Sequence, residues 1–245
     1  MTIHYVDNSD GRTFWQASHV YSVGDRCACQ ASSTNATYRH HVYECTTGGT
    51  SGGTAPSWNA NVGQTCNDNG VIWTTRDPHS WADAHPSFVL MMEDGFVAAG
   101  DMVKIHDAHN EVCPSTDGRL NFIFNTGGSV GNPCFIVCVD KNDSDSLSSG
   151  AVIQVQRSTK AIYGDQIVVL INVQLIIDGV LACDTNTTII FVSIGDPLTV
   201  LTLNGTGSRL DFGQAWNNNL RLILMNSNLK FAYAANYMEL NSWCF

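Results

Sequence analysis

The sequence is poor in charge, and in basic residues above all. Only 14% of its 245 residues are charged, and 12 Lys and Arg stand against 22 Asp and Glu, a formal net charge of −10. Nucleic-acid affinity depends largely on basic side chains that neutralise phosphates, so no DNA or RNA partner is expected. Few Glu and Lys also means few of the residues that stabilise exposed helices, which favours strands and turns.

Long apolar runs are missing as well. No stretch reaches the ~20 apolar residues that a membrane helix needs, so membrane insertion is not expected. The first twenty residues include Asp7, Asp10 and Arg12 and contain no apolar run, so they do not form a signal peptide. We therefore expect a protein that is made in the cytoplasm.

Signatures of catalysis are absent from the sequence. It contains no Gly-x-Ser-x-Gly elbow, no phosphate-binding loop and no paired Cys/His nucleophile signature. The nine cysteines are an odd number without an export signal, and we interpret most as small buried residues. Neither Cys27-x-Cys29 nor Cys134-x3-Cys138 has zinc-knuckle spacing. We predict no enzyme activity, no cofactor and no metal.

One polar segment invites a catalytic or metal-binding interpretation. His106, Asp107, His109 and Glu111 lie close together in the sequence. A helical metalloprotease motif needs two His four residues apart with a Glu between them, which this segment lacks. Polar residues of a loop or strand end are the prediction here.

Residues 1–78 are dense in Trp, Gly, Thr and Asn and predict a small β module. Turn signals such as Asp68-Asn69-Gly70 separate three candidate strands, at residues 26–30, 41–45 and 70–75. Flat aromatic faces can stack on sugars, and the candidate carbohydrate-binding residues are Trp15, Tyr43, Trp58 and Trp73. The alternative is that these rings build the core, since so small a domain has few other large apolar side chains.

Residues 79–98 follow Pro78 and contain Pro86, and they predict a linker or covering segment. From residue 87 onward, short apolar runs predict strands between Asn, Gly and Ser turns. The predicted strands lie at 88–92, 135–139, 151–155, 167–171, 171–179, 188–194, 198–203, 208–212, 220–225 and 228–231.

Residues 99–245 predict a right-handed parallel β-helix, also called a solenoid, so that the whole chain is all-β. The pair Asn226-Ser227 recurs as Asn241-Ser242, and a recurring corner Asn can bond the backbone of a neighbouring coil. An antiparallel β-sandwich remains the alternative, because strand periodicity does not report strand direction.

The order of motifs in the first part resembles a module found in phage tail and virion proteins, and is similar to small carbohydrate-binding modules. The elements are Trp15, Gly24-Asp25, Tyr43, Gly49-Thr50-Ser51-Gly52, Pro56-x-Trp58 and Asp68-x-Gly70-x-x-Trp73. In the second part, Ala99-Gly100-Asp101-x-Val103-x-Ile105, with Asn132-Pro133 before a strand, resembles the opening of the β-helix in phage structural proteins.

This resemblance implies a non-enzymatic structural protein on the surface of a bacteriophage virion: a tail fibre, a spike or a capsid decoration protein. Its partners would be other virion proteins and a host surface glycan. The chain ends inside an apparent strand, and an unfinished coil needs a cap, further chain or neighbouring subunits, so we expect a homotrimer. A polysaccharide-degrading tailspike and a lectin-like adhesin are the alternatives.

Overall fold

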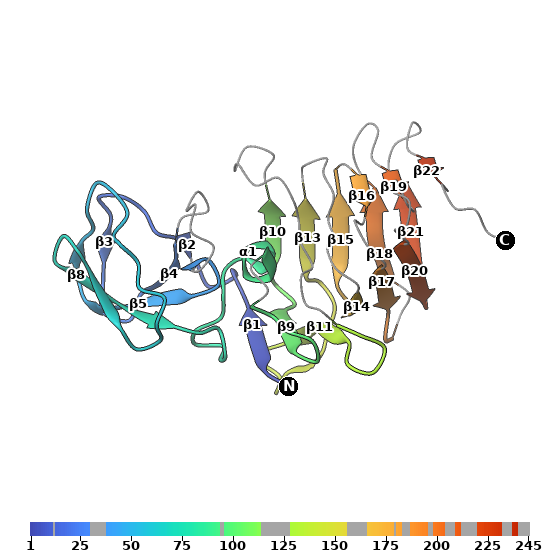
Figure 1. Cartoon of the computed structure of the whole chain (residues 1–245), viewed down its shortest axis with the longest axis horizontal. Helices are drawn as coiled ribbons and strands as arrows, with labels where there is room; N and C mark the ends of the chain where they lie inside the picture. The colour runs from blue at the N-terminus through green and yellow to red at the C-terminus, as the bar shows by residue number, and fades with distance from the viewer. Residues whose placement is uncertain are drawn as a thin grey trace.

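The fold is seen in a computed structural model that is almost entirely β-strand. The structure describes residues 1–11, 13–29, 38–93, 96–113, 128–155, 166–178, 180–182, 187–195, 198–203, 209–211, 220–231 and 237–239. Figure 1 shows two regions along the long axis, a small β module at one end and a series of stacked strands behind it.

The module comprises residues 13–76 and is built on two sheets. The larger has the order β2-β4-β5-β8-β7 and the smaller pairs β3 with β6. Their bounds are β2 Thr13–Phe14, β3 Val20–Tyr21, β4 Arg26–Ala28, β5 Val42–Thr47, β6 Gly49–Thr50, β7 Thr65–Asp68 and β8 Val71–Arg76. The three strands predicted from the sequence correspond to β4, β5 and β8. Pairing is antiparallel except between β2 and β4.

The core of the module forms around one buried carboxylate. Asp68 Oδ2 accepts hydrogen bonds from the indoles of Trp15 and Trp73, at 2.7 and 3.1 Å. Its Oδ1 accepts from the backbone N–H of Gly52 at 2.7 Å. The tight turn after Asp68 places Asn69 and Gly70 at φ 53° and 96°, which brings β7 back onto β8.

The remaining strands form three sheets of almost entirely parallel strands, which we call the stack. The first sheet contains β1 Ile3–Val6, β9 Met102–His106, β11 Cys134–Asp140, β14 Gln166–Ile171, β17 Thr187–Val192 and β20 Leu220–Met225, and β12 Ser146–Leu147 pairs antiparallel with β11. The second contains β10 Asn110–Cys113, β13 Val152–Val155, β15 Gln174–Ile177, β18 Leu198–Leu203 and β21 Ser227–Phe231. The third contains β16 Val180–Ala182, β19 Arg209–Asp211 and β22 Tyr237–Glu239.

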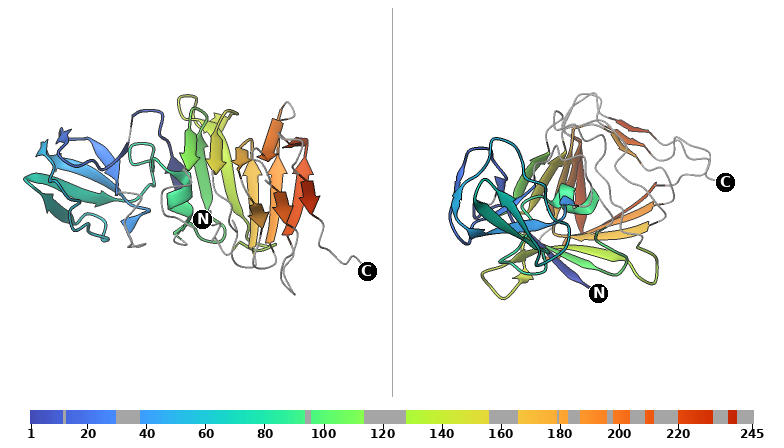
Figure 2. Two further views of the ribbon diagram at one scale, coloured as in Figure 1. Left: turned by 90° about the horizontal axis from the view of Figure 1, so that it is seen from above. Right: turned by 60° about the vertical axis from the view of Figure 1, so that its left-hand side comes forward.

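The chain passes repeatedly from the first sheet to the second and returns one strand further on, as Figure 2 shows from two more sides. The register aligns apolar side chains in rows, such as Val103, Ile136, Leu170 and Phe191, all of which are buried. This parallel pairing differs from that of an antiparallel sandwich, so that alternative is wrong.

Asparagines that follow strands of the first sheet bond to the backbone of segments that follow neighbouring strands. Asn172 follows β14 at φ 56°, and its Nδ2 donates to the carbonyls of Ser148 and Ile194 at 2.9 and 3.3 Å. Its Oδ1 accepts from the N–H of Ile194 at 2.7 Å. Asn226 follows β20 at φ 50° and donates to the carbonyls of Ser193 and Gly195. The echo at Asn241-Ser242 lies outside the described residues.

The strand predicted at residues 88–92 is wrong, because this segment is α-helical. Helix α1 spans Phe88–Glu93 and buries Phe88, Val89, Met91 and Met92 against the end of the stack. Its residues are almost all apolar. In so short and continuous an apolar run, the spacing of apolar residues cannot distinguish a helix from a strand. Figure 1 shows α1 between the module and β10.

The first strand belongs to the stack, although the sequence-based division assigned it to residues 1–78. β1 pairs in parallel with β9, with Ile3 opposite Met102. On its other side, the Tyr5 N–H donates to the Pro78 carbonyl, and the His85 N–H donates to the Tyr5 carbonyl, both at 2.8 Å. The module is therefore inserted between two neighbouring strands of one sheet.

The Ala-Gly-Asp motif at the start of β9 also has a structural role. Gly100 has φ 82°, a backbone conformation that other residues adopt only with strain, and its Cα faces the Asn132 side chain. Asp101 accepts hydrogen bonds from the N–H groups of Thr2 and Ala98 at 2.6 and 3.0 Å. The motif thus fastens the N-terminal residues to the start of β9.

Candidate functional site

The junction between module and stack gathers histidines from three parts of the chain. We call His4, His40, His41 and His79 the histidine cluster. His4 lies on β1, His40 and His41 precede β5, and His79 follows β8. The Phe96 ring contacts all four imidazoles, and it stacks on those of His40 and His79 at centroid distances of 4.0 and 5.9 Å.

Two carboxylates flank the histidine cluster. Asp101 Oδ2 lies 3.2 Å from His4 Nε2, and Asp77 Oδ1 lies 2.8 Å from His41 Nδ1. The His41 imidazole lowers the pKa of Asp77, chiefly by hydrogen bonding, and this outweighs the opposing effect of burial. Asp77 is therefore an anion at neutral pH.

Burial keeps two imidazoles of the cluster neutral. It lowers the pKa of His40 to about 3, with a further contribution from the nearby His41. Burial also lowers the pKa of His4, although the hydrogen bond to Asp101 opposes the shift. Neutral imidazoles carry the lone pair that a metal ion or a proton donor needs.

A second group of His and Asp side chains lies nearby on the first sheet and contains two residues singled out from the sequence. His106 Nδ1 lies 3.0 Å from Ser9 Oγ and 3.2 Å from Asp7 Oδ1, and His106 Nε2 lies 3.1 Å from Asp107 Oδ1. Lys141 forms an ion pair with Asp7. We call these residues, together with Asp140, the His106 network.

Asp7 anchors this network as an anion. Burial alone would raise its pKa, but hydrogen bonds from Lys141 and Ser9 outweigh that effect and lower the pKa from 3.8 to about 2. His106 and Asp107 thus form part of a polar network that ties the chain after β1 to β9 and β11. As the sequence predicts, they lie at a strand end and in the turn that follows it.

Glu111 and His109 support helix α1. The Glu111 carboxylate accepts hydrogen bonds from the Phe88 N–H at 2.7 Å and from the Ser87 hydroxyl. His109 Nε2 lies 3.3 Å from Glu111 Oε2, and these contacts keep the pKa of Glu111 low despite its burial. The Ser87 hydroxyl in turn accepts from the Leu90 N–H at 3.1 Å. This is the arrangement of a helix N-cap with a buried anion.

The four aromatic residues proposed for carbohydrate binding lie in the core of the module. Trp15, Tyr43, Trp58 and Trp73 are between 0% and 7% exposed, and the Trp58 ring packs on those of Tyr43 and Trp73. A sugar cannot stack on a buried ring, so burial supports the core interpretation of these residues.

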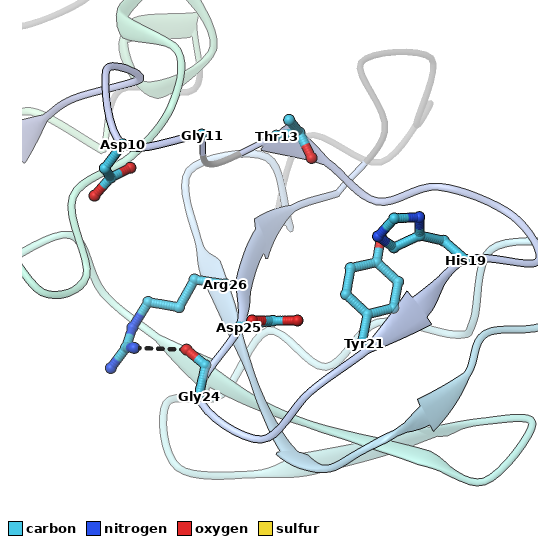
Figure 3. A pocket seen from close by; sticks show the side chains of 8 residues that line it. All are labelled: Asp10, Gly11, Thr13, His19, Tyr21, Gly24, Asp25 and Arg26. Atoms are coloured by element: carbon cyan, nitrogen blue, oxygen red, sulfur yellow. Dashed lines mark hydrogen bonds between the residues drawn. The ribbon is translucent and has the colours of Figure 1, made fainter.

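The module also has a surface cavity of about 360 Å³. Figure 3 shows its lining, which comes from Asp10, Gly11 and Thr13 and from the segment 19–26. The side chains of Asp10, His19, Asp25 and Arg26 line it together with the Tyr21 ring. The Arg26 guanidinium is already engaged, since it donates to the Gly24 carbonyl at 3.0 Å and pairs with Glu44 and Asp83.

The buried-cysteine prediction is confirmed for five of the described residues. Cys27, Cys29, Cys45, Cys134 and Cys138 are at most 1% exposed. Burial raises the pKa of Cys27 well above its usual value and that of Cys138 to about 11, so these thiols stay protonated at neutral pH.

Comparisons with family models, with curated proteins and with solved structures returned no match to this chain. No helix in the described part of the chain is long and apolar enough to span a membrane.

Sequence reasoning missed the histidine cluster and Asp77. Only the adjacent pair His40-His41 is a local signal, and Asp77 lies 36 residues beyond His41 in the printed sequence. These residues meet because β5 pairs with β8, with Val42 opposite Arg76. His41 and Asp77 are the next residues outward on the two strands, so the register brings their side chains together.

Proposed function

We propose that this protein is a non-enzymatic structural component of a bacteriophage virion surface, made in the host cytoplasm, whose residues 99–245 form a right-handed parallel β-helix. The observation that carries the proposal is the parallel register of successive strands in three sheets, with the small module at one end (Figure 1). Such a stack forms a stiff, elongated body, which suits a projecting fibre, spike or decoration protein.

A non-enzymatic role is supported by the structural contacts of the residues that resemble catalytic groups in the sequence, Glu111, His109 and His106. Glu111 and His109 hold helix α1, and His106 joins the chain after β1 to β9. A polysaccharide-degrading tailspike is the enzymatic alternative. Incubation of the full chain with host capsular polysaccharide separates the two, because release of oligosaccharides would contradict the proposal.

A homotrimer is part of the proposal. Ile223 and Met225 on β20 are 42% and 53% exposed, and their neighbour Leu224 is 37% exposed. Packing of these apolar side chains between subunits would remove them from water. Light scattering on the full chain should give the mass of three subunits at micromolar concentration, and a monomeric mass would contradict this part.

Contact with a host glycan is assigned to the cavity of Figure 3, because its polar lining faces solvent whereas the four predicted rings are buried. Carboxylates and imidazoles are suitable hydrogen-bonding partners for sugar hydroxyls. His19→Ala should weaken retention on a host-glycan column, while Val62→Ala, a change at an exposed site outside the cavity lining, should not. Equal retention of the two variants would contradict this assignment.

A cryo-electron-microscopy map of the intact particle tests the main proposal. Density into which the parallel stack fits is expected on the particle surface. Its position on the capsid lattice would indicate a decoration protein, and a position on the tail would indicate a fibre or spike. A particle that carries the chain inside the capsid, or lacks it, would contradict the proposal.

A further inference from the structure

Three side chains of the junction, His40, His41 and Asp77, bring their ligand atoms within 4.8 Å of one another. His40 Nδ1 is buried and has no hydrogen-bond partner. The His41 side chain is only 6% exposed, and its Nδ1 is paired with Asp77 Oδ1 at 2.8 Å. Buried polar atoms usually have partners, because an unmet group loses its hydration without replacement.

We propose that His40, His41 and Asp77 form a binding site for a divalent transition-metal ion, with Zn²⁺ as the best fit. One ion would give the buried Nδ1 of His40 a partner and would bind the paired His41 and Asp77 at the same time. Two imidazole nitrogens and one carboxylate oxygen are a donor set that Zn²⁺ binds readily, whereas Ca²⁺ and Mg²⁺ require mostly oxygen ligands.

The distances suit such an ion after a small adjustment. The three ligand atoms all lie within 4.8 Å of one another. Zinc bonds of about 2.1 Å hold any two ligand atoms no more than about 4.2 Å apart, so the required movement is on the order of half an ångström. His40 and Asp77 are only partly buried, so both side chains are partly accessible to solvent.

The protonation states also suit metal binding. Metal ligands must be deprotonated, and at neutral pH a carboxylate is ordinarily ionised and an imidazole ordinarily mostly neutral. The ion would lie where segments before β5 and after β8 meet, next to the Phe96 ring that contacts both imidazoles.

The His106 network provides an internal contrast. His106, Asp107 and Asp140 also bring their ligand atoms within 4.8 Å. There, however, both nitrogens of His106 have partners, Asp107 Oδ2 accepts from Ser148, and Asp140 Oδ1 accepts from the Asn142 N–H. A metal would have to displace several existing bonds in this network, whereas at the proposed site it would replace the single contact between His41 and Asp77.

The test uses the full chain after removal of metal with a chelator. Calorimetric titration with Zn²⁺ should show one ion per chain, and the full chain should unfold at a higher temperature with Zn²⁺ than without it. His40→Gln and Asp77→Asn should each weaken binding by roughly tenfold or more. The matched control His106→Gln should bind as the unchanged protein does, and far-UV circular dichroism checks that each variant folds.

Co²⁺ in place of Zn²⁺ identifies the ligands by absorption. The expected spectrum contains visible bands of a nitrogen and oxygen site and no thiolate charge-transfer band. A strong thiolate band would show that cysteines bind the ion, and it would overturn the proposal. Full-strength binding by folded His40→Gln and Asp77→Asn variants, or its loss in His106→Gln alone, would overturn it as well.

Discussion

The module and the stack reach stability in different ways. The module depends on one buried carboxylate, since Asp68 bonds two indoles and the backbone of Gly52. The stack repeats similar contacts from strand to strand, with buried apolar rows and with asparagines that bond to segments after neighbouring strands. Where each element contacts mainly its neighbours, damage at one position stays local. A single substitution should therefore disrupt the module as a unit, but the stack only in part.

The largest expected effect is that of Asp68→Ala. It leaves three buried donors without an acceptor, and at about 1 to 3 kcal/mol for each unmet group the module should lose about 4 kcal/mol of unfolding free energy. Hydrogen exchange should become fast throughout the described parts of residues 13–76 and stay slow in β11 to β18. Asp68→Asn, which keeps one acceptor oxygen, should lose less. Unchanged protection of the module in Asp68→Ala would contradict the comparison.

Leu170→Ala probes the stack in the same way. Leu170 is 1% exposed and lies in the row between Ile136 and Phe191, so its truncation should cost about 3 kcal/mol. Faster exchange should be confined to β11, β14 and β17, while the module keeps its protection. The surface change Val130→Ala, at a residue that is 88% exposed, is the matched control. Loss of protection throughout the chain would show that the stack unfolds as one unit.

Acid should weaken the attachment of the chain after β1 to β9 and β11, which depends on Asp7. Its pKa lies below the unfolded value of 3.8, at about 2, so its stabilising contribution is present above pH 4 and lost as the pH falls from 3.8 towards 2. The shift corresponds to about 2 kcal/mol. Asp7→Asn should remove this amount at neutral pH and flatten the decline between pH 4 and 2 in chemical denaturation. An equally steep decline in the variant would assign the acid sensitivity to other carboxylates.

The smallest effect is expected at a corner of the stack. Asn172→Gly keeps the left-handed backbone but removes three side-chain hydrogen bonds, and a loss of about 1 kcal/mol is expected because water replaces part of them. Asn172→Ala loses the same bonds and adds backbone strain, so its melting temperature should be lower than that of the Gly variant. Equal melting temperatures for the two variants would mean that the backbone conformation contributes nothing.

Local patterns in the sequence predicted much of the stack and the turns of the module. The runs at 135–139, 167–171 and 198–203 are strands. Each is rich in β-branched and other apolar residues, and turn residues separate one run from the next. Asn69-Gly70 is a tight turn because both residues tolerate positive φ. These features depend on neighbours in the sequence, and so they can be read from it.

The features that were missed depend on distant partners. Phe88–Glu93 becomes a helix because Ser87 and Glu111 cap it and the end of the stack buries it. β1 joins the stack through β9, and His41 meets Asp77 through the pairing of β5 with β8. The spacing of apolar residues along a short segment gives no information about such long-range contacts. The sequence also did not show whether the four aromatic rings form the core of the module or an exposed binding surface. Only their burial in the folded protein distinguishes these two roles.

The insertion of the module between β1 and β9 has a consequence for how the chain folds. The Thr2 N–H donates a hydrogen bond to the side chain of Asp101, 99 residues further along the chain, so closing the loop between them is slow if the intervening chain is unstructured. A module that folds first brings its two ends together, since Val6 lies beside His85. Folding of the module would then shorten the effective loop and guide the first strand into its sheet, acting as a built-in assembly aid for the stack.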